Sequence, residues 1–185
     1  MDAFAEHELV RRARSGDEDA FAELVQRHSG RLYGTMLRVL RSPTAAEDVA
    51  QETFVRAWRA LGSFRGDALF STWLYRIGMN EANRHLAREA RRGELPSENV
   101  LDDVPDLAAD PAAAYDAGDL GVHLDRLLGE LPPDYRIAVV LRDVEGLTNE
   151  EAAEVLGLHV RNFKSRLHRG RMALRRGLER LAEEP

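Results

Sequence analysis

Apolar residues recur at intervals of three and four along most of the chain, and this spacing predicts helices. In the first half of the chain the predicted helices cover about residues 6–14, 18–40, 45–61 and 69–91. The periodicity is lost after residue 92 and resumes near Asp116, from where we predict four more helices. No stretch shows the strict alternation of a half-buried strand. The predicted fold class is therefore all-α.

Capping residues set the expected ends of several helices. Ser42-Pro43 ends the second predicted helix. Thr44 with Glu47 three residues on has the form of a capping box, which predicts that the third helix begins there. Thr148 and Glu151 form a second capping box near the end of the chain. The third helix is expected to bury five side chains: Val49, Phe54, Val55, Trp58 and Leu61.

The last two predicted helices, within residues 149–176, have the features of a helix-turn-helix. Ala153 stands where two crossing helices leave room only for a small side chain. Gly157 is suited to the left-handed turn between the helices, and Phe163 is expected to be the buried anchor of the second helix. A plain helical hairpin is the alternative, and it is less favoured because the second helix is densely basic.

The second helix of this pair carries the residues expected to meet DNA. In a helix-turn-helix the first residues of this helix contact base edges in the major groove. The residues placed there are Arg161, Asn162, Lys164 and Ser165. Further along the helix, the predicted DNA-binding residues are Arg166, His168, Arg169 and Arg171.

Charge is distributed unevenly along the 185 residues, whose formal net charge is −6. Eight acids and no Lys or Arg lie between Glu94 and Asp119. Between Arg161 and Arg180 there are eight Lys or Arg and one acid. An acidic protein that concentrates basic charge on one helix is suited to place that helix on a polyanion.

The acidic stretch also divides the chain. Residues 93–114 contain three prolines and few large apolar side chains, which predicts a flexible linker. We therefore expect two small helical domains, residues 1–92 and residues 115–185.

Composition excludes several functions. The chain has no cysteine, which rules out disulfides, thiolate metal sites and cysteine nucleophiles. The six histidines are scattered, and neither an HExxH motif nor a glycine-rich phosphate loop occurs. We therefore predict no catalytic residue, no metal site and no cofactor. No apolar run approaches membrane-spanning length and the N-terminus lacks a signal-peptide pattern, so the expected location is the cytoplasm.

Two groups of polar residues in the first half admit a plain and a functional interpretation. Asp48 and Glu52 lie off the apolar stripe of the third helix, where a solvated face with an ion pair from Glu52 to Arg56 explains them. Asn80 and Asn83 lie one turn apart on the fourth helix. They either lie on a helix surface that tolerates Asn, or they present their side-chain amides to the edges of DNA bases. For Asp48 and Glu52, the spacing alone favours the interpretation as a solvated face.

Three segments together resemble a known family. They are AEDVAQETFVRAW (46–58), RGDALFSTWLYRIGMNEANRHL (65–86) and LPPDYRIAVVLRDVEGLTNEEAAEVLGLHVRNFKSRLHRGRMALRRGL (131–178). In this order they resemble the extracytoplasmic-function sigma factors of bacterial RNA polymerase. The resemblance covers both expected domains and implies that the protein directs polymerase to promoters.

The resemblance also implies roles for single residues. The surface for the clamp helices of the polymerase β′ subunit matches Asp48, Gln51 and Glu52. The loop that holds a flipped base of the promoter −10 element matches Phe64, Arg65, Asp67 and Ala68. The helix that reads the −10 sequence matches Asn80, Asn83 and Arg84. The last helix pair matches the −35 reader.

The partners implied by the resemblance are core RNA polymerase, through its β′ and β subunits, promoter DNA and an anti-sigma factor. Residues 159–163 (HVRNF) depart from the family, which usually carries small or hydroxyl-bearing residues there. Arg161 replaces a small residue at a base-facing position, so the −35 sequence preferred by the family is not assumed for this protein. Because the chain ends soon after residue 178, no fused C-terminal sensor domain is expected.

Two other functions fit part of the pattern. A stand-alone helix-turn-helix regulator would bind duplex DNA as a dimer, but it would not need the first half of the chain. A sigma-like mimic that sequesters an anti-sigma factor would keep the fold and lose the DNA contacts. The Arg and Lys residues retained in 161–176 argue against the mimic.

Overall fold

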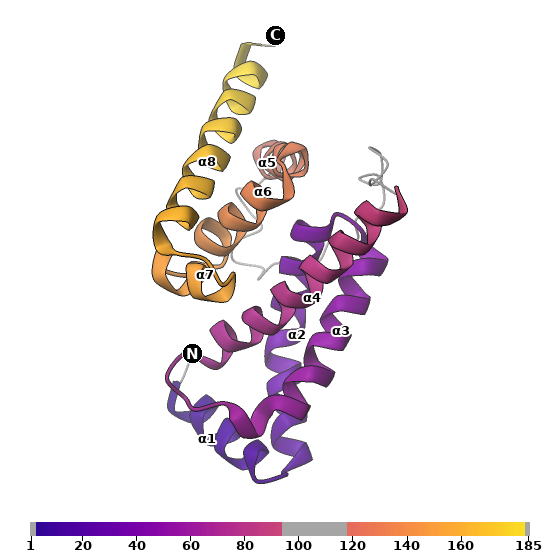
Figure 1. The fold of residues 1–185 in the computed structure, drawn as a ribbon, viewed down its shortest axis with the longest axis vertical. Helices are drawn as coiled ribbons and strands as arrows, with labels where there is room; N and C mark the ends of the chain where they lie inside the picture. The colour runs from indigo at the N-terminus through magenta and orange to yellow at the C-terminus, as the bar shows by residue number, and fades with distance from the viewer. Residues whose placement is uncertain (1–2, 94–117, 184–185) are drawn as a thin grey trace.

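The computed structural model describes residues 3–93 and 118–183 (Figure 1). The first group of helices comprises α1 (Ala3–Arg14), α2 (Glu18–Leu40), α3 (Pro43–Ala60) and α4 (Phe70–Arg92), with a short 3-10 turn η1 (Leu61–Ser63). The second comprises α5 (Gly118–Glu130), α6 (Pro133–Val139), α7 (Asn149–Val155) and α8 (Val160–Glu183), with a π-helical turn η2 (Val140–Val144). Every element in these two described ranges is helical, which confirms the all-α prediction. The predicted linker lies outside the described residues apart from Gly93.

Close packing of α2, α3 and α4 fixes the first group. Leu32 and Met36 of α2 are buried, and so is Met79 of α4. A Cβ added at Gly78 of α4 would lie 3.2 Å from the Met36 side chain and 3.4 Å from Thr53 of α3. Glycine thus lets α4 approach both neighbours, and this packing orients the outer face of α4.

The start of α3 differs from the prediction. Ser42, not Thr44, is the N-cap, and its hydroxyl accepts a hydrogen bond from the Ala45 N–H at 3.3 Å. Pro43 then occupies the first turn, where its fixed φ and missing N–H are tolerated. The predicted capping box at Thr44 and Glu47 is therefore wrong.

The buried face of α3 also differs. Val55 is 43% exposed, which contradicts its predicted burial. The side chains that α3 buries most deeply are mainly small: Ala45, Ala46, Val49, Ala50, Thr53 and Ala57. Small side chains allow the helices to approach closely, and Val55 lies outside that stripe.

The helix-turn-helix has the predicted local structure. Ala153 and Phe163 are fully buried, and Gly157 has a φ of +63°. The Thr148 hydroxyl accepts from the Glu151 N–H at 3.1 Å, while the Glu151 carboxylate accepts from the Thr148 N–H at 2.8 Å. The capping box, the left-handed turn and the buried anchor are confirmed.

Replacing Thr148 by Ala should destabilise the protein by about 1 kcal/mol, because the N–H of Glu151 loses its cap. Denaturant unfolding measures this change. Thr44→Ala is the matched control, because Thr44 lies exposed in the first turn of α3 and is not its cap. Equal destabilisation by the two substitutions would contradict the capping role.

The two groups of helices pack against each other through a buried carboxylate. Glu145 follows η2, and its side chain is 2% exposed. It accepts hydrogen bonds from Arg31 Nε (2.8 Å), Thr35 Oγ1 (2.5 Å) and Tyr75 OH (2.5 Å), which belong to α2 and α4. Within the described ranges, no helix is long and apolar enough to cross a membrane.

Candidate nucleic-acid interface

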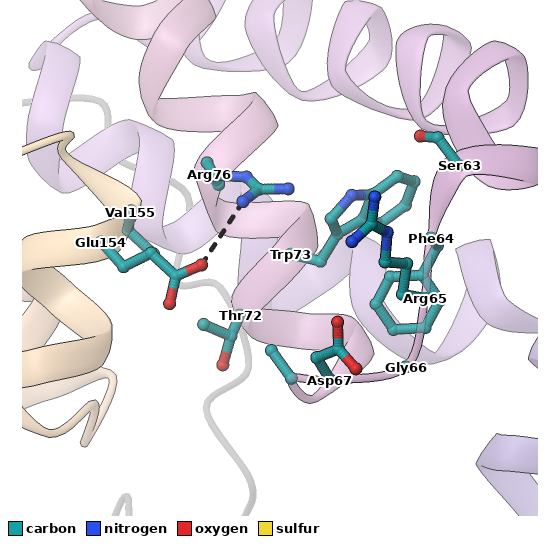
Figure 2. A pocket seen from close by; sticks show the side chains of 11 residues that line it. Ser63, Phe64, Arg65, Gly66, Asp67, Thr72, Trp73, Arg76, Glu154 and Val155 are labelled. Atoms are coloured by element: carbon teal, nitrogen blue, oxygen red, sulfur yellow. Dashed lines mark hydrogen bonds and ion pairs between the residues drawn. The ribbon is translucent and has the colours of Figure 1, made fainter.

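A cavity of about 300 Å³ lies beside the loop that joins η1 to α4 (Figure 2). Residues 63–68 form one side of the cavity, and Thr72, Trp73 and Arg76 of α4 line it further. Gly66 has a φ of +82°, a conformation that favours glycine, and it turns the loop around the cavity. Four residues predicted for a flipped base are therefore brought together here: Phe64, Arg65, Asp67 and Ala68.

Aromatic rings line the inner side of this cavity. Phe64 is only 6% exposed, and its ring centroid lies 5.1 Å from that of Trp73 and 6.0 Å from that of Phe70. Phe64 thus belongs to the cavity wall, whereas Arg65 and Asp67 are exposed. The combination offers a stacking surface with a cation and a carboxylate beside it, which suits a nucleobase.

Seven of the eleven residues that line this cavity lie outside the four predicted ones, among them Thr72, Trp73 and Arg76 of α4. None of these three residues belongs to a motif that predicts a role in the site, and Glu154 and Val155 of α7 also line the cavity. Thr72 and Arg76 are four residues apart at the start of α4, directly after the loop, so helical spacing places them on one side. That spacing is the signal from which they could have been predicted.

The outer face of α4 forms a shallow groove of about 500 Å³. The predicted residues Asn80, Asn83 and Arg84 line it together with Arg88 and Arg91. This face combines amide groups, which suit base edges, with guanidinium groups, which suit phosphates.

A buried carboxylate below this face orients Arg84. Glu81 is 5% exposed, and its carboxylate lies 2.6 Å from Arg84 Nη1 and 3.0 Å from Arg56 Nε. Arg56 also pairs with Glu52 at 2.7 Å, as the sequence predicted. Arg84 is therefore held at the edge of the groove by a network that reaches α3.

The first turns of α8 present the polar residues predicted for base contacts. Arg161, Asn162, Lys164 and Ser165 are all exposed. Among the described residues, Arg161 and Lys164 have no ion-pair partner. Both cations are therefore available to a ligand outside the helix.

Further along α8, three arginines are engaged within the domain. Arg166 lies 3.1 Å from Asp134. Arg169 donates to the Tyr135 hydroxyl at 3.2 Å, and this hydrogen bond raises the pKa of Arg169.

Arg171 forms two hydrogen bonds to Asp143, at 3.0 and 2.5 Å, which raise its pKa. These contacts orient residues that were predicted to bind DNA. His168, also predicted to bind DNA, is exposed on the same helix.

An acidic and amide-bearing strip lies on the outer face of α3. Asp48 and Gln51 are exposed, Glu52 is half-buried, and Gln51 donates to Glu47 at 3.3 Å. Val55 lies four residues after Gln51, so the exposed valine joins the same face. The surface predicted to bind polymerase thus has an apolar residue that the sequence did not indicate.

Comparison with known proteins gives the family. The family model for Sigma-70 region 2 matches residues 24–92, and that for Sigma-70 region 4 matches residues 122–174. The RNA polymerase sigma-H factor of Pseudomonas aeruginosa is 36% identical, over 97% of this chain and 96% of the relative. The ECF RNA polymerase sigma-E factor of Haemophilus influenzae is 36% identical, over 88% of this chain and 89% of the relative. The chain belongs to the extracytoplasmic-function (ECF) sigma factors.

Solved structures of similar fold agree with this sigma factor assignment. CnrH, in complex with the cytosolic domain of CnrY, is 32% identical with a TM-score of 0.68, covering 95% of this chain and 97% of CnrH. The sigma factor RpoE of Bartonella quintana, solved in complex with the anti-sigma factor NepR, is 26% identical with a TM-score of 0.69. The match covers 86% of this chain and 96% of RpoE. Loop 63–68 and the α4 groove of this sigma factor lie within its region 2 match. The first turns of α8, and the cavity-lining residues Glu154 and Val155, lie within its region 4 match.

Proposed function

We propose that this sigma factor binds core RNA polymerase and directs it to promoters through two separate DNA-binding sites. It would act in the cytoplasm, and it would act by binding rather than by catalysis. The observation that carries the proposal is the cavity beside loop 63–68, which is lined mainly by this loop and by α4, outside the helix-turn-helix, with Glu154 and Val155 of α7 completing its wall. A stand-alone helix-turn-helix regulator has no use for such a cavity. The domain limits proposed are residues 1–92 and 115–185, with 93–114 as a tether.

The first domain would recognise and open the −10 element. The cavity residues Phe64, Arg65, Asp67 and Ala68 would hold one base out of the stack, with Trp73 extending the stacking surface. The groove residues Asn80, Asn83 and Arg84 would read neighbouring bases. Unstacking a base costs a few kcal/mol, which ring and ion contacts in the cavity would offset.

The second domain would recognise the −35 element with α8 in the major groove. The residues that would face bases are Arg161, Asn162, Lys164 and Ser165, and their exposure in the first turns of the helix supports this role. Arg166, His168, Arg169 and Arg171 would contact phosphates or position the helix.

The protein partners proposed are core polymerase and an anti-sigma factor. Asp48, Gln51 and Glu52, with Val55 beside them, would bind the β′ clamp helices, while the second domain would contact the β subunit. RpoE is solved with the anti-sigma factor NepR, which supports a partner of that kind here.

The test of this proposal is transcription by core polymerase with and without the protein. Initiation at specific sites only when the protein is added supports the proposal. Duplex DNA binding as a dimer, with no polymerase retained in a pull-down, would favour the stand-alone regulator.

Binding of the full chain to a duplex carrying its −35 sequence should weaken steeply with salt, because several phosphate contacts release counterions. Arg169→Ala, which removes a proposed phosphate contact, should reduce the slope of log K against log salt concentration by about 1, measured by fluorescence anisotropy. Arg126→Ala is the control, since Arg126 lies on α5 and pairs with Glu130. A flat salt profile of the unaltered protein would contradict the phosphate contacts.

A further inference from the structure

Helix α1 lies before the Sigma-70 region 2 match, which begins at residue 24. Three of its side chains, Leu9, Val10 and Ala13, are buried, and α1 packs on α2. The helix also contacts η1, where the loop that lines the cavity begins (Figure 1). A Cβ added at Gly66 of this loop would lie 3.9 Å from the His7 ring. Thus α1 lies against the loop that is proposed to hold a flipped base.

A largely buried polar contact joins α1 to α2. His28 of α2 is 7% exposed, and its Nε2 atom lies 3.1 Å from the carboxylate of Glu6 on α1. The Glu6 side chain is itself only 17% exposed. An ionised carboxylate can only accept a hydrogen bond, so Nε2 of His28 carries the hydrogen. Because a buried polar group is costly without a partner, this contact fixes the orientation of the His28 ring.

The His28 ring in turn contacts the aromatic side chains of the cavity. Its centroid lies 5.3 Å from that of Phe70, the first residue of α4. Phe70 is 3% exposed, and its ring lies 6.0 Å from Phe64 and 5.7 Å from Trp73. Phe64 and Trp73 line the cavity (Figure 2). A continuous series of contacts therefore runs from Glu6 to the cavity wall.

This series matters because the rings are closely packed. A packed interior has little free space, so a change in the orientation of one ring shifts the rings that touch it. A binding surface holds its ligand best when a second layer of side chains fixes the residues that touch the ligand. His28 and Phe70 form such a layer behind Phe64. Loss of the contact to Glu6 would release the His28 ring, and the Phe64 ring would lose its fixed position.

We propose that Glu6 and His28 are positioning residues for recognition of the flipped −10 base, and that they act through Phe70 on the Phe64 ring. Neither Glu6 nor His28 is among the described residues that line the cavity, so neither touches the base. Helix α1 thereby becomes part of the −10 site although it lies outside the region 2 match. This inference rests on the proposed function of the cavity.

The experiment uses the full chain bound to core polymerase and a series of single-stranded −10 oligonucleotides. One oligonucleotide is intact, and in the others each base is removed in turn. The position whose removal weakens binding most to the unaltered protein is the flipped one. The ratio of the Kd without this base to the Kd of the intact strand measures recognition of the base.

Glu6→Gln keeps the size of the side chain and removes its charge. It should lower this ratio by about tenfold, because a hydrogen bond to a charged group is lost. His28→Gln should lower the ratio similarly, and it keeps the test available if Glu6→Gln impairs folding. The double variant should be no worse than either single one, because both substitutions remove the same contact.

Glu8→Gln is the matched control, since Glu8 also lies on α1 and pairs with Arg11 within that helix. It should leave the ratio unchanged. The oligonucleotide that lacks the flipped base should bind Glu6→Gln, His28→Gln and the unaltered protein equally. Affinity for core polymerase should also stay the same, because the series of contacts does not include the α3 strip.

The outcomes separate this inference from the function on which it rests. An unchanged ratio in both Glu6→Gln and His28→Gln overturns the inference. So does equal weakening for the intact strand and the strand without the base, since the contact then supports only the fold. If removal of no single base weakens binding to the unaltered protein, the proposed function of the cavity is contradicted, and the inference falls with it.

Discussion

Replacement of Asp48 by Arg is expected to weaken binding to core RNA polymerase by about tenfold, or about 1.4 kcal/mol. Asp48 is exposed on the outer face of α3, beside Gln51 and Glu52. Reversing its charge places a cation where the partner surface is proposed to favour an anion, and like charges across an interface are costly. A fluorescence titration of labelled protein with core polymerase measures the change.

The control for Asp48→Arg is Glu23→Arg, because Glu23 is also an exposed acid that pairs within its own helix, with Arg27 on α2. It should leave the affinity for polymerase unchanged. Unchanged affinity in Asp48→Arg would remove the α3 strip from the proposed interface. Val55 offers an independent check, since truncating this exposed side chain on the same face should weaken binding without a charge change.

Replacement of Arg161 by Ala should reduce promoter-specific transcription by roughly 5- to 150-fold, the range that 1–3 kcal/mol of base contact gives. Arg161 is exposed in the first turn of α8 and has no ion-pair partner among the described residues, so its guanidinium is free to meet a base. Binding to core polymerase should not change. Run-off transcription and a polymerase titration, made on the same preparation, measure the two quantities.

Arg180→Ala is the matched control for Arg161→Ala, because Arg180 is exposed in the last turn of the same helix. Its effect on transcription should be small. If Arg161→Ala lowers transcription and polymerase binding equally, the substitution has disturbed the whole protein rather than a contact to DNA. The proposed role of Arg161 at the −35 element would then be wrong.

Local chemistry explains which parts of this fold were predictable. The Thr148 capping box, the left-handed Gly157 and the buried Phe163 each follow from residues within a few positions of one another. The helices themselves follow from apolar periodicity. Such features depend little on the rest of the chain, so the sequence indicates them directly.

The features that were missed depend on tertiary packing. Val55 is apolar, as core residues usually are. However, α3 packs closely against its neighbours through a stripe of mainly small side chains, and this packing leaves Val55 exposed. Trp73 is buried, yet it also lines the cavity. Burial and function are not alternatives at that position.

The contact at Glu145 was beyond sequence reasoning altogether. Its donors lie 70 to 114 residues away, and none of them forms a motif with it. Only the packed structure brings a carboxylate after η2 against α2 and α4. The residues proposed to bind polymerase and the −10 element rested instead on family resemblance, whereas those proposed to bind the −35 element followed from the helix-turn-helix pattern. The structure adds the exposure and the partners of both sets.

In vitro transcription on genomic fragments tests the central claim most directly. Core polymerase plus the protein should initiate at a small set of discrete sites, each preceded by a shared pair of elements near −10 and −35. Core polymerase alone should not initiate there, and Arg161→Ala should reduce initiation at all of them. If adding the protein produces no specific start sites while it binds polymerase-free duplex DNA, the account of a two-site sigma factor is contradicted.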